Sequence, residues 1–136
     1  MPAITEQFSI DVTGESGQKY PGIFKAKPRL SHRDALLQDQ FRRDLLGPKA
    51  DQPVAGGAQA VADVFSKIWV HLTEAPLWWR EAGNGIDLID EAPVAAVYKE
   101  ILRIEREAIE KVLKKGEEAK ESIKAPEAAA PLAKAP

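Results

Sequence analysis

Two adjacent tryptophans, Trp78 and Trp79, lie between Pro76 and the glycine-asparagine-glycine segment 83–85. Neighbouring side chains point in different directions on a helix and on a strand, so the two indoles cannot enter one core in the same way. Proline and glycine interrupt regular elements on both sides of the pair. The pair predicts a corner of the chain, with one indole in the core and the other available to a partner. The alternative is that both indoles complete the core.

The first 28 residues predict a β-hairpin, because apolar and polar residues alternate in two runs around the turn segment 14–17. Pro28 closes the second run, since proline has no amide donor. An isolated hairpin is only marginally stable, so its apolar face must rest on helices or join a partner's sheet. That face consists of Phe8, Ile10, Val12, Tyr20, Gly22, Phe24 and Ala26.

Residues 29–115 predict a helical body. Periodic apolar residues predict a first helix over 32–46, which Ser31 and Asp34 can cap, and a second helix over 58–73. The connection between them, 48–57, contains two prolines and the glycine pair Gly56-Gly57, and it predicts a flexible hinge. The glycine pair lacks the other residues of a phosphate-binding loop.

The longest helical pattern starts at Asp90 and Glu91 and continues to about residue 124. Residues 116–124 predict a charged helical extension, and the alanine- and proline-rich segment 125–136 predicts a disordered tail. The fold class is therefore α+β, mainly α, with the hairpin packed on a small helical domain. The expected inner face of the long helix consists of Val94, Val97, Tyr98, Ile101, Leu102, Ile104, Ala108, Ile109, Val112 and Leu113.

Charge and composition exclude several classes of protein. Nineteen basic and 21 acidic residues give a net charge of −2, which argues against nucleic-acid binding. One small basic cluster consists of Lys25, Lys27, Arg29 and Arg33, and we interpret it as local solvation of the surface. No apolar run is long enough to span a membrane. The chain has no cysteine, so neither a disulfide framework nor thiolate chemistry is expected.

Catalytic and metal-binding patterns are weak. Asp87, Asp90 and Glu91 are oxygen ligands near a glycine-rich turn, but they lack EF-hand spacing and are better interpreted as the start of a helix. His32 is expected in solvent and His71 at the edge of the core, without metal-ligand spacing between them. No serine lies in a nucleophile elbow. We therefore expect a non-enzymatic protein with no cofactor, and no metal site.

Partner binding is the function that the remaining features favour. A large aromatic residue beside an arginine is typical of interface hot spots. The exposed edges of a hairpin are a second possible contact surface. The candidate partner-binding residues are Trp78, Trp79, Arg80 and Phe24.

Four segments together resemble the tail assembly chaperones of tailed bacteriophages, over about residues 20–113. They are Gly22-Ile23-Phe24-Lys25, Arg29-Leu30-Ser31-His32-Arg33-Asp34, Arg42-Arg43-Asp44-Leu45-Leu46-Gly47, and Pro76-Leu77-Trp78-Trp79 followed by Gly85-Ile86-Asp87-Leu88-Ile89-Asp90. The resemblance implies a self-associating, non-enzymatic protein in the host bacterial cytoplasm. Such proteins coat the tape measure protein until polymerisation of the tail tube displaces them. The competing hypothesis is a permanent virion protein, a minor component of capsid or neck, that uses the hairpin and the long helix as subunit contacts.

Overall fold

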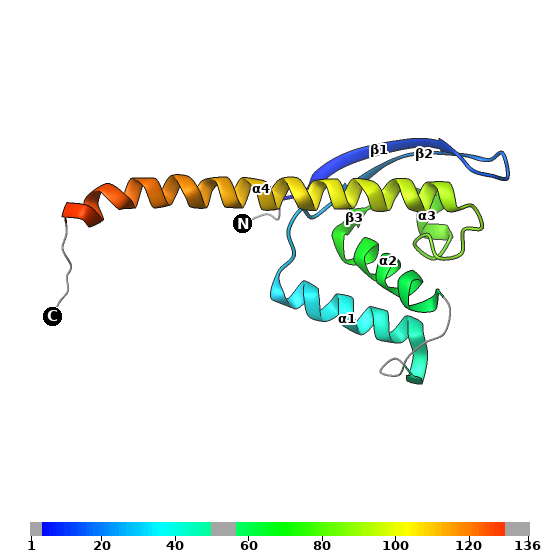
Figure 1. Cartoon of the computed structure of the whole chain (residues 1–136). Helices are drawn as coiled ribbons and strands as arrows, with labels where there is room; N and C mark the ends of the chain where they lie inside the picture. The colour runs from blue at the N-terminus through cyan, green and yellow to red at the C-terminus, as the bar shows by residue number, and fades with distance from the viewer. Residues whose placement is uncertain (1–3, 50–56, 130–136) are drawn as a thin grey trace.

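The computed structural model describes residues 4–49 and 57–129. Figure 1 shows the hairpin lying along the first half of α4, with α2 below α4 and α1 outermost; the second half of α4 projects beyond the other elements. This architecture confirms the predicted α+β, mainly helical fold. The elements in chain order are β1 (Glu6–Thr13), β2 (Lys19–Ala26), α1 (His32–Leu46), the 3-10 helix Gly47–Lys49, α2 (Ala58–His71), β3 (Leu72–Glu74), α3 (Leu77–Glu81) and α4 (Glu91–Ala129).

The hairpin has the predicted face. β1 and β2 pair antiparallel with Phe8 opposite Phe24, and these two rings stack with their centroids 5.1 Å apart. Directly opposite side chains on one face of a sheet are close enough to stabilise the pairing. Val12 is only partly buried, while the buried members of this face are Phe8, Ile10, Tyr20, Phe24 and Ala26.

A third strand was not predicted. The second helix ends at His71, two residues earlier than expected, and Leu72–Glu74 pairs with the end of β2 as β3. Lys25 and Glu74 form an ion pair of 3.5 Å across these strands. A strand of three residues is too short to show alternation, and Leu72 continues the helical spacing from Ile68, so the sequence pattern concealed the change.

The core lies between the sheet and the first half of α4. Val97, Ile101 and Ile104 of α4 are buried there against the hairpin, Ile68 and Trp79. The predicted inner face of α4 is wrong for Leu102, Ile109, Val112 and Leu113, which are exposed. Helical periodicity identifies an apolar face but does not reveal where the rest of the protein stops covering it.

The end of α4 also corrects the predicted boundaries. The helix extends to Ala129, beyond the predicted end at 124, so residues 125–129 are helical. The rest of the predicted tail, 130–136, lies outside the described residues, as do residues 50–56 of the predicted hinge.

The first helix is capped as predicted. The Ser31 hydroxyl accepts a hydrogen bond from the Asp34 amide at 3.1 Å, and the Asp34 carboxylate accepts one from the Ser31 amide at 3.0 Å. His32 is exposed, in agreement with the prediction. None of the residues of α1, all of which the structure describes, is buried. The helix instead rests on α2 through Phe41 and Trp69, whose rings stack 4.6 Å apart.

The capping carboxylate predicts a pH dependence. A hydrogen bond from Lys27 at 2.8 Å, together with the Ser31 amide, lowers the pKa of Asp34 from 3.8 to about 2. A carboxyl whose pKa is lower in the folded chain stabilises it above the unfolded value, and that contribution disappears as the pH falls from about 4 to about 2. Asp34→Asn should therefore lower the free energy of unfolding by about 1 kcal/mol at pH 7. Urea titrations at pH 7 and pH 2.5 should show the difference shrinking in acid; a constant difference would contradict this origin.

Candidate interaction surface

The tryptophan corner packs against the hairpin. Trp79 is 1% exposed, and its ring meets Phe24 edge-on with centroids 5.5 Å apart. Trp78 is partly buried, and its indole Nε1 donates a hydrogen bond of 2.7 Å to the carbonyl oxygen of Pro21. Trp79 is therefore the core residue of the pair, while Trp78 packs on Tyr20 and Phe24 of the same hairpin face and keeps some exposed surface.

Two glycines make room for this corner. A Cβ atom on Gly22 would lie 2.5 Å from Cγ of Pro76, so only glycine lets the corner approach β2 so closely. Gly85 has a φ of 92°, and a Cβ atom there would lie 2.6 Å from the ring of Trp79. Both positions need glycine for space, and Gly85 needs it also for its backbone conformation. The sequence identified the turn but not these contacts.

Burial corrects two of the candidate partner-binding residues. Phe24 is fully buried and Trp79 nearly so, and neither offers surface to a partner in this fold. Their aromatic rings complete the core instead. Arg80 is exposed and Trp78 is partly exposed, so these two remain a prediction.

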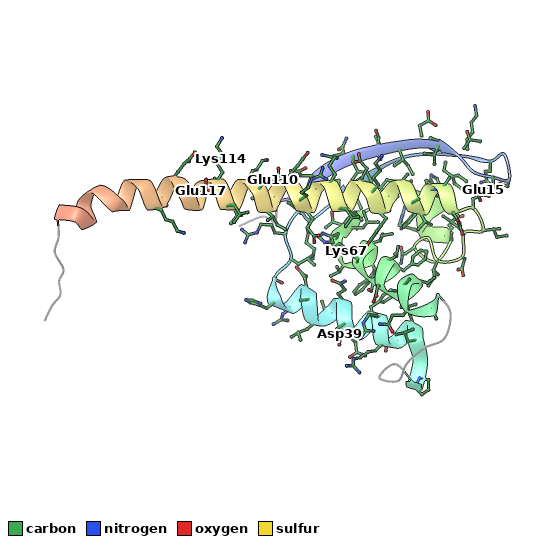
Figure 2. The ribbon with its side chains drawn as sticks, viewed as in Figure 1. Glu15, Asp39, Lys67, Glu110, Lys114 and Glu117 are labelled. Carbon is green, nitrogen blue, oxygen red and sulfur yellow. The ribbon has the colours of Figure 1, made fainter. Side chains whose placement is uncertain are left out.

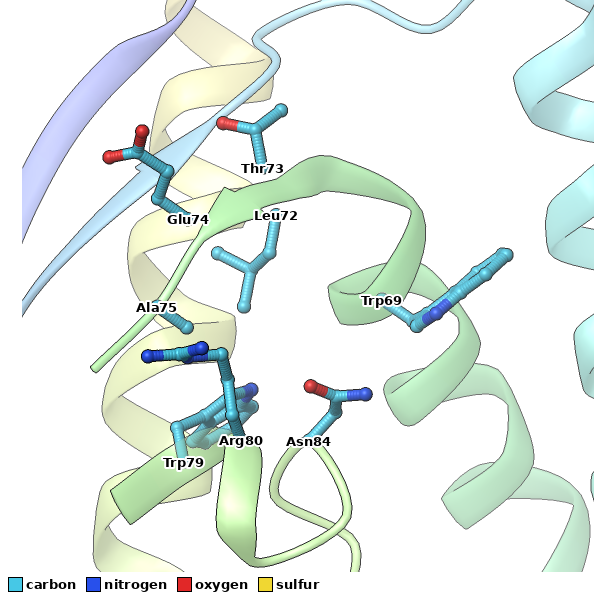
Figure 3. A pocket seen from close by; sticks show the side chains of 8 residues that line it. All are labelled: Trp69, Leu72, Thr73, Glu74, Ala75, Trp79, Arg80 and Asn84. Atoms are coloured by element: carbon cyan, nitrogen blue, oxygen red, sulfur yellow. The ribbon is translucent and has the colours of Figure 1, made fainter. Parts of the chain in front are cut away.

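Arg80 lies at an open cavity of about 420 Å³ between the end of α2, β3 and α3. Figure 3 shows Arg80 lying over Trp79, with Asn84 between them and Trp69. The guanidinium of Arg80 forms no hydrogen bond or ion pair with another described residue, although the Arg80 amide donates to the Pro76 carbonyl at 3.2 Å. The cavity lining therefore combines the rings of Trp69 and Trp79 with Thr73, Glu74 and the guanidinium of Arg80.

Asp90 ties the hairpin turn to the start of α4. Its carboxylate accepts hydrogen bonds from the Ser16 amide at 3.0 Å, the Ser16 hydroxyl at 2.5 Å and the Tyr20 hydroxyl at 2.5 Å. The hydrogen bonds from Ser16 and Tyr20 lower the pKa of Asp90. The hydrogen bond that the Tyr20 hydroxyl donates to Asp90 raises the pKa of Tyr20.

Asp90 and Glu91 take part in contacts at the start of α4. α4 begins at Glu91, as the helix-start interpretation predicted, and the Glu91 amide donates a hydrogen bond to the Glu15 carboxylate at 3.2 Å. Within the part of the chain that the structure describes, no group of three histidine, aspartate, glutamate or cysteine side chains could hold a metal ion. The carboxylate of Asp90 is a structural acceptor.

His71 is more deeply buried than predicted. Its Nδ1 lies 2.6 Å from the carbonyl oxygen of Lys27, which can only accept, so Nδ1 carries a proton. Its Nε2 lies 3.3 Å from Glu105, whose carboxylate also accepts a hydrogen bond of 2.8 Å from Lys67. Burial acts to raise the pKa of Glu105, but Lys67 and His71 outweigh it and the pKa is lowered. The cluster joins α2 and α4 to Lys27, the residue that follows β2, and is a structural network.

The projecting half of α4 carries exposed aliphatic residues. Ile109, Val112 and Leu113 are 53%, 41% and 63% exposed, and we call them the α4 stripe. Figure 2 shows this half of the helix with charged side chains such as Glu110 and Lys114. Helical spacing places the three aliphatic side chains on neighbouring positions of one side. The stripe is therefore an apolar strip in a charged helical surface.

A groove of about 590 Å³ begins where α4 leaves the core. One wall is α4, from Ala108 to Lys115, and the other walls are the start of β1 and the segment from Lys27 to Asp34. Val112 belongs to both the groove and the α4 stripe. The two features form one continuous surface, which the sequence did not predict because the same residues were assigned to the core.

Among the described helices, none combines the length and the apolar composition needed to cross a membrane. No protein-family model, no curated protein sequence and no solved structure matches this chain.

Proposed function

We propose that this protein is a non-enzymatic assembly chaperone of the bacteriophage tail type, which binds apolar helical segments of the tape measure protein during tail morphogenesis. The observation that carries the proposal is the α4 stripe: Ile109, Val112 and Leu113 lie exposed on a helix that projects from the body. Aliphatic residues grouped on one side of an exposed helix mark a surface for a partner. The resemblance of residues 20–113 to tail assembly chaperones adds the class of partner.

The energetics of the stripe suit a reversible contact. Covering three half-exposed aliphatic side chains contributes about 1 kcal/mol each, or about 3 kcal/mol together. A contact of this size needs several chaperone molecules along a client, or additional contacts, to hold it. Self-association along the client is therefore part of the proposal. A polymerising tail tube could then displace the chaperone, because each contact is weak.

A capture experiment tests this function. The chain would be co-expressed with the tape measure protein of the same phage, and the double variant Ile109→Asp/Leu113→Asp should retain about one tenth of the captured protein or less, since two buried charges would oppose binding. Both positions are exposed, so folding should be unchanged by circular dichroism. Lys114→Asp is the matched control on the charged side of the same helix and should capture normally. Equal capture by the double variant and the wild type would contradict the proposal.

The second candidate function is a permanent virion protein. The outer edge of β1, which spans eight residues, pairs with no strand among the described residues. Such an edge can accept a strand from a neighbouring subunit. Mass spectrometry of purified particles separates the two roles, because fixed stoichiometry in the virion favours this candidate and absence from it favours the chaperone. In both roles the protein would act in the host bacterial cytoplasm while particles assemble.

A further inference from the structure

The groove beside α4 continues the face that α4 uses in the core. Ile101 and Ile104 contact the hairpin, and further positions of the same face, Ala108 and Val112, line the groove beyond the end of the body. From Ala108 to Lys115 the α4 wall is about 10 Å long. This is the length of two helical turns of a partner, and the small side chain of Ala108 leaves room for close approach.

The charges around the groove are unbalanced. Lys111 and Lys115 of α4 and Arg29 of the opposite wall line the groove, and none of them forms an ion pair with another described residue. Lys27 is already neutralised by Asp34 at 2.8 Å. Glu6 is the remaining carboxylate in the lining. The groove therefore has an apolar floor, formed by Ile4, Pro28, Ala108 and Val112, and an excess of positive charge, although the net charge of the whole chain is −2.

We infer that this groove binds an amphipathic helix whose apolar face is flanked by aspartate or glutamate. The inference rests on the proposed function and specifies the chemistry of the client segment. Ile4, Pro28 and Val112 would cover the apolar face, and Arg29, Lys111 and Lys115 would pair with the flanking carboxylates. Complementary charge fixes the orientation of a helix in a groove and excludes partners of the wrong charge.

A second copy of the chain fits the groove less well. The projecting part of α4 from residue 109 to 120 has four lysines and three glutamates, so it is itself slightly basic. Nucleic acid would use the cations but would leave the apolar floor without a partner. An amphipathic helix with flanking carboxylates would pair with the cations and would also cover the apolar floor.

Two designed helical peptides of about 20 residues test the inference; they share one leucine face and differ in whether glutamate or lysine flanks it. Fluorescence anisotropy with the full chain should show the glutamate peptide binding about ten-fold or more tighter than the lysine peptide at about 50 mM salt, with a smaller difference at about 150 mM. In Lys111→Glu/Lys115→Glu the preference should reverse. Lys114→Glu, which changes an adjacent charge outside the groove, should keep the wild-type preference.

Three outcomes would overturn the inference: equal affinity for the two peptides, an unchanged preference in Lys111→Glu/Lys115→Glu, or displacement of the peptide by a single-stranded oligonucleotide that competes through the same two lysines. Circular dichroism of each variant verifies that it is folded. Loss of the peptide preference with capture of the tape measure protein intact would reject the acidic client alone. Capture that does not depend on Ile109 and Leu113 would reject the proposed function itself.

Discussion

Replacing Trp79 with alanine is expected to lower the free energy of unfolding by about 3 to 5 kcal/mol, because truncation of a fully buried tryptophan removes apolar contacts and leaves a cavity. Trp79 is 1% exposed and contacts Phe24 and Trp78 edge-on. Its ring also covers Gly85. Urea denaturation followed by far-UV circular dichroism measures the loss without depending on tryptophan fluorescence.

Trp78→Ala is the matched comparison. This residue is only partly buried, and the substitution removes one hydrogen bond to the Pro21 carbonyl and the ring contacts with Tyr20, Phe24 and Trp79. We expect a loss of about 1 to 2 kcal/mol. The difference between the two variants reports which indole is in the core. Equal losses would contradict the packing described for the corner.

Gly85→Ala is expected to lower the free energy of unfolding by about 2 to 4 kcal/mol, from the left-handed conformation and from overpacking together. The φ of Gly85 is 92°, and the added Cβ would lie 2.6 Å from the Trp79 ring. The ring is held on its other sides by the core, so it cannot move away without disturbing Phe24. The same urea experiment measures the effect.

Gly116→Ala provides the control for this substitution. Gly116 lies within α4, and nothing lies within 4 Å of the position that a Cβ atom would take. Alanine in an exposed helix interior is more favourable than glycine by about 0.5 to 1 kcal/mol, so helicity should rise slightly and the core should be unaffected. A comparable loss in both glycine variants would show that the contact with Trp79 is not the cause.

Local patterns predicted most of the secondary structure. The hairpin face was predicted because alternation has a period of two along β1 and β2, and the register then placed Phe8 against Phe24. The first helix was predicted because Ser31 and Asp34 form a capping box that can be identified within four residues. These signals depend on neighbours in the sequence, which is why they needed no tertiary information.

Contacts between distant parts of the chain were not predictable in this way. Asp90 reaches the Ser16 and Tyr20 hydroxyls across 74 and 70 residues, and no local pattern connects them. His71 depends in the same way on Glu105, 34 residues away. For Asp90 the sequence indicated only a helix start. Its carboxylate's hydrogen bonds to the hairpin became visible only in the folded structure.

Two of the residues expected to bind a partner lie in the core for a physical reason. Aromatic residues beside Arg80 predict a partner-binding surface at the corner, but the side chains of Phe24 and Trp79 are buried in the core. Ile109, Val112 and Leu113 continue the apolar periodicity of α4, and that periodicity predicts a core face for them. An apolar helix face that packs on its own domain and one that binds another protein have the same periodicity, because both are made of apolar side chains. Periodicity alone therefore does not distinguish them.

The proposed function requires that the exposed face of α4 binds a client during tail assembly. A photo-crosslinking amino acid at Val112, which lies in both the groove and the α4 stripe, tests it most directly in infected cells. We expect a crosslink to the tape measure protein before tails are complete, and little or none from the same probe at Lys114. Crosslinks from Val112 only to structural proteins of finished virions, or equal yields from the two positions, would contradict it.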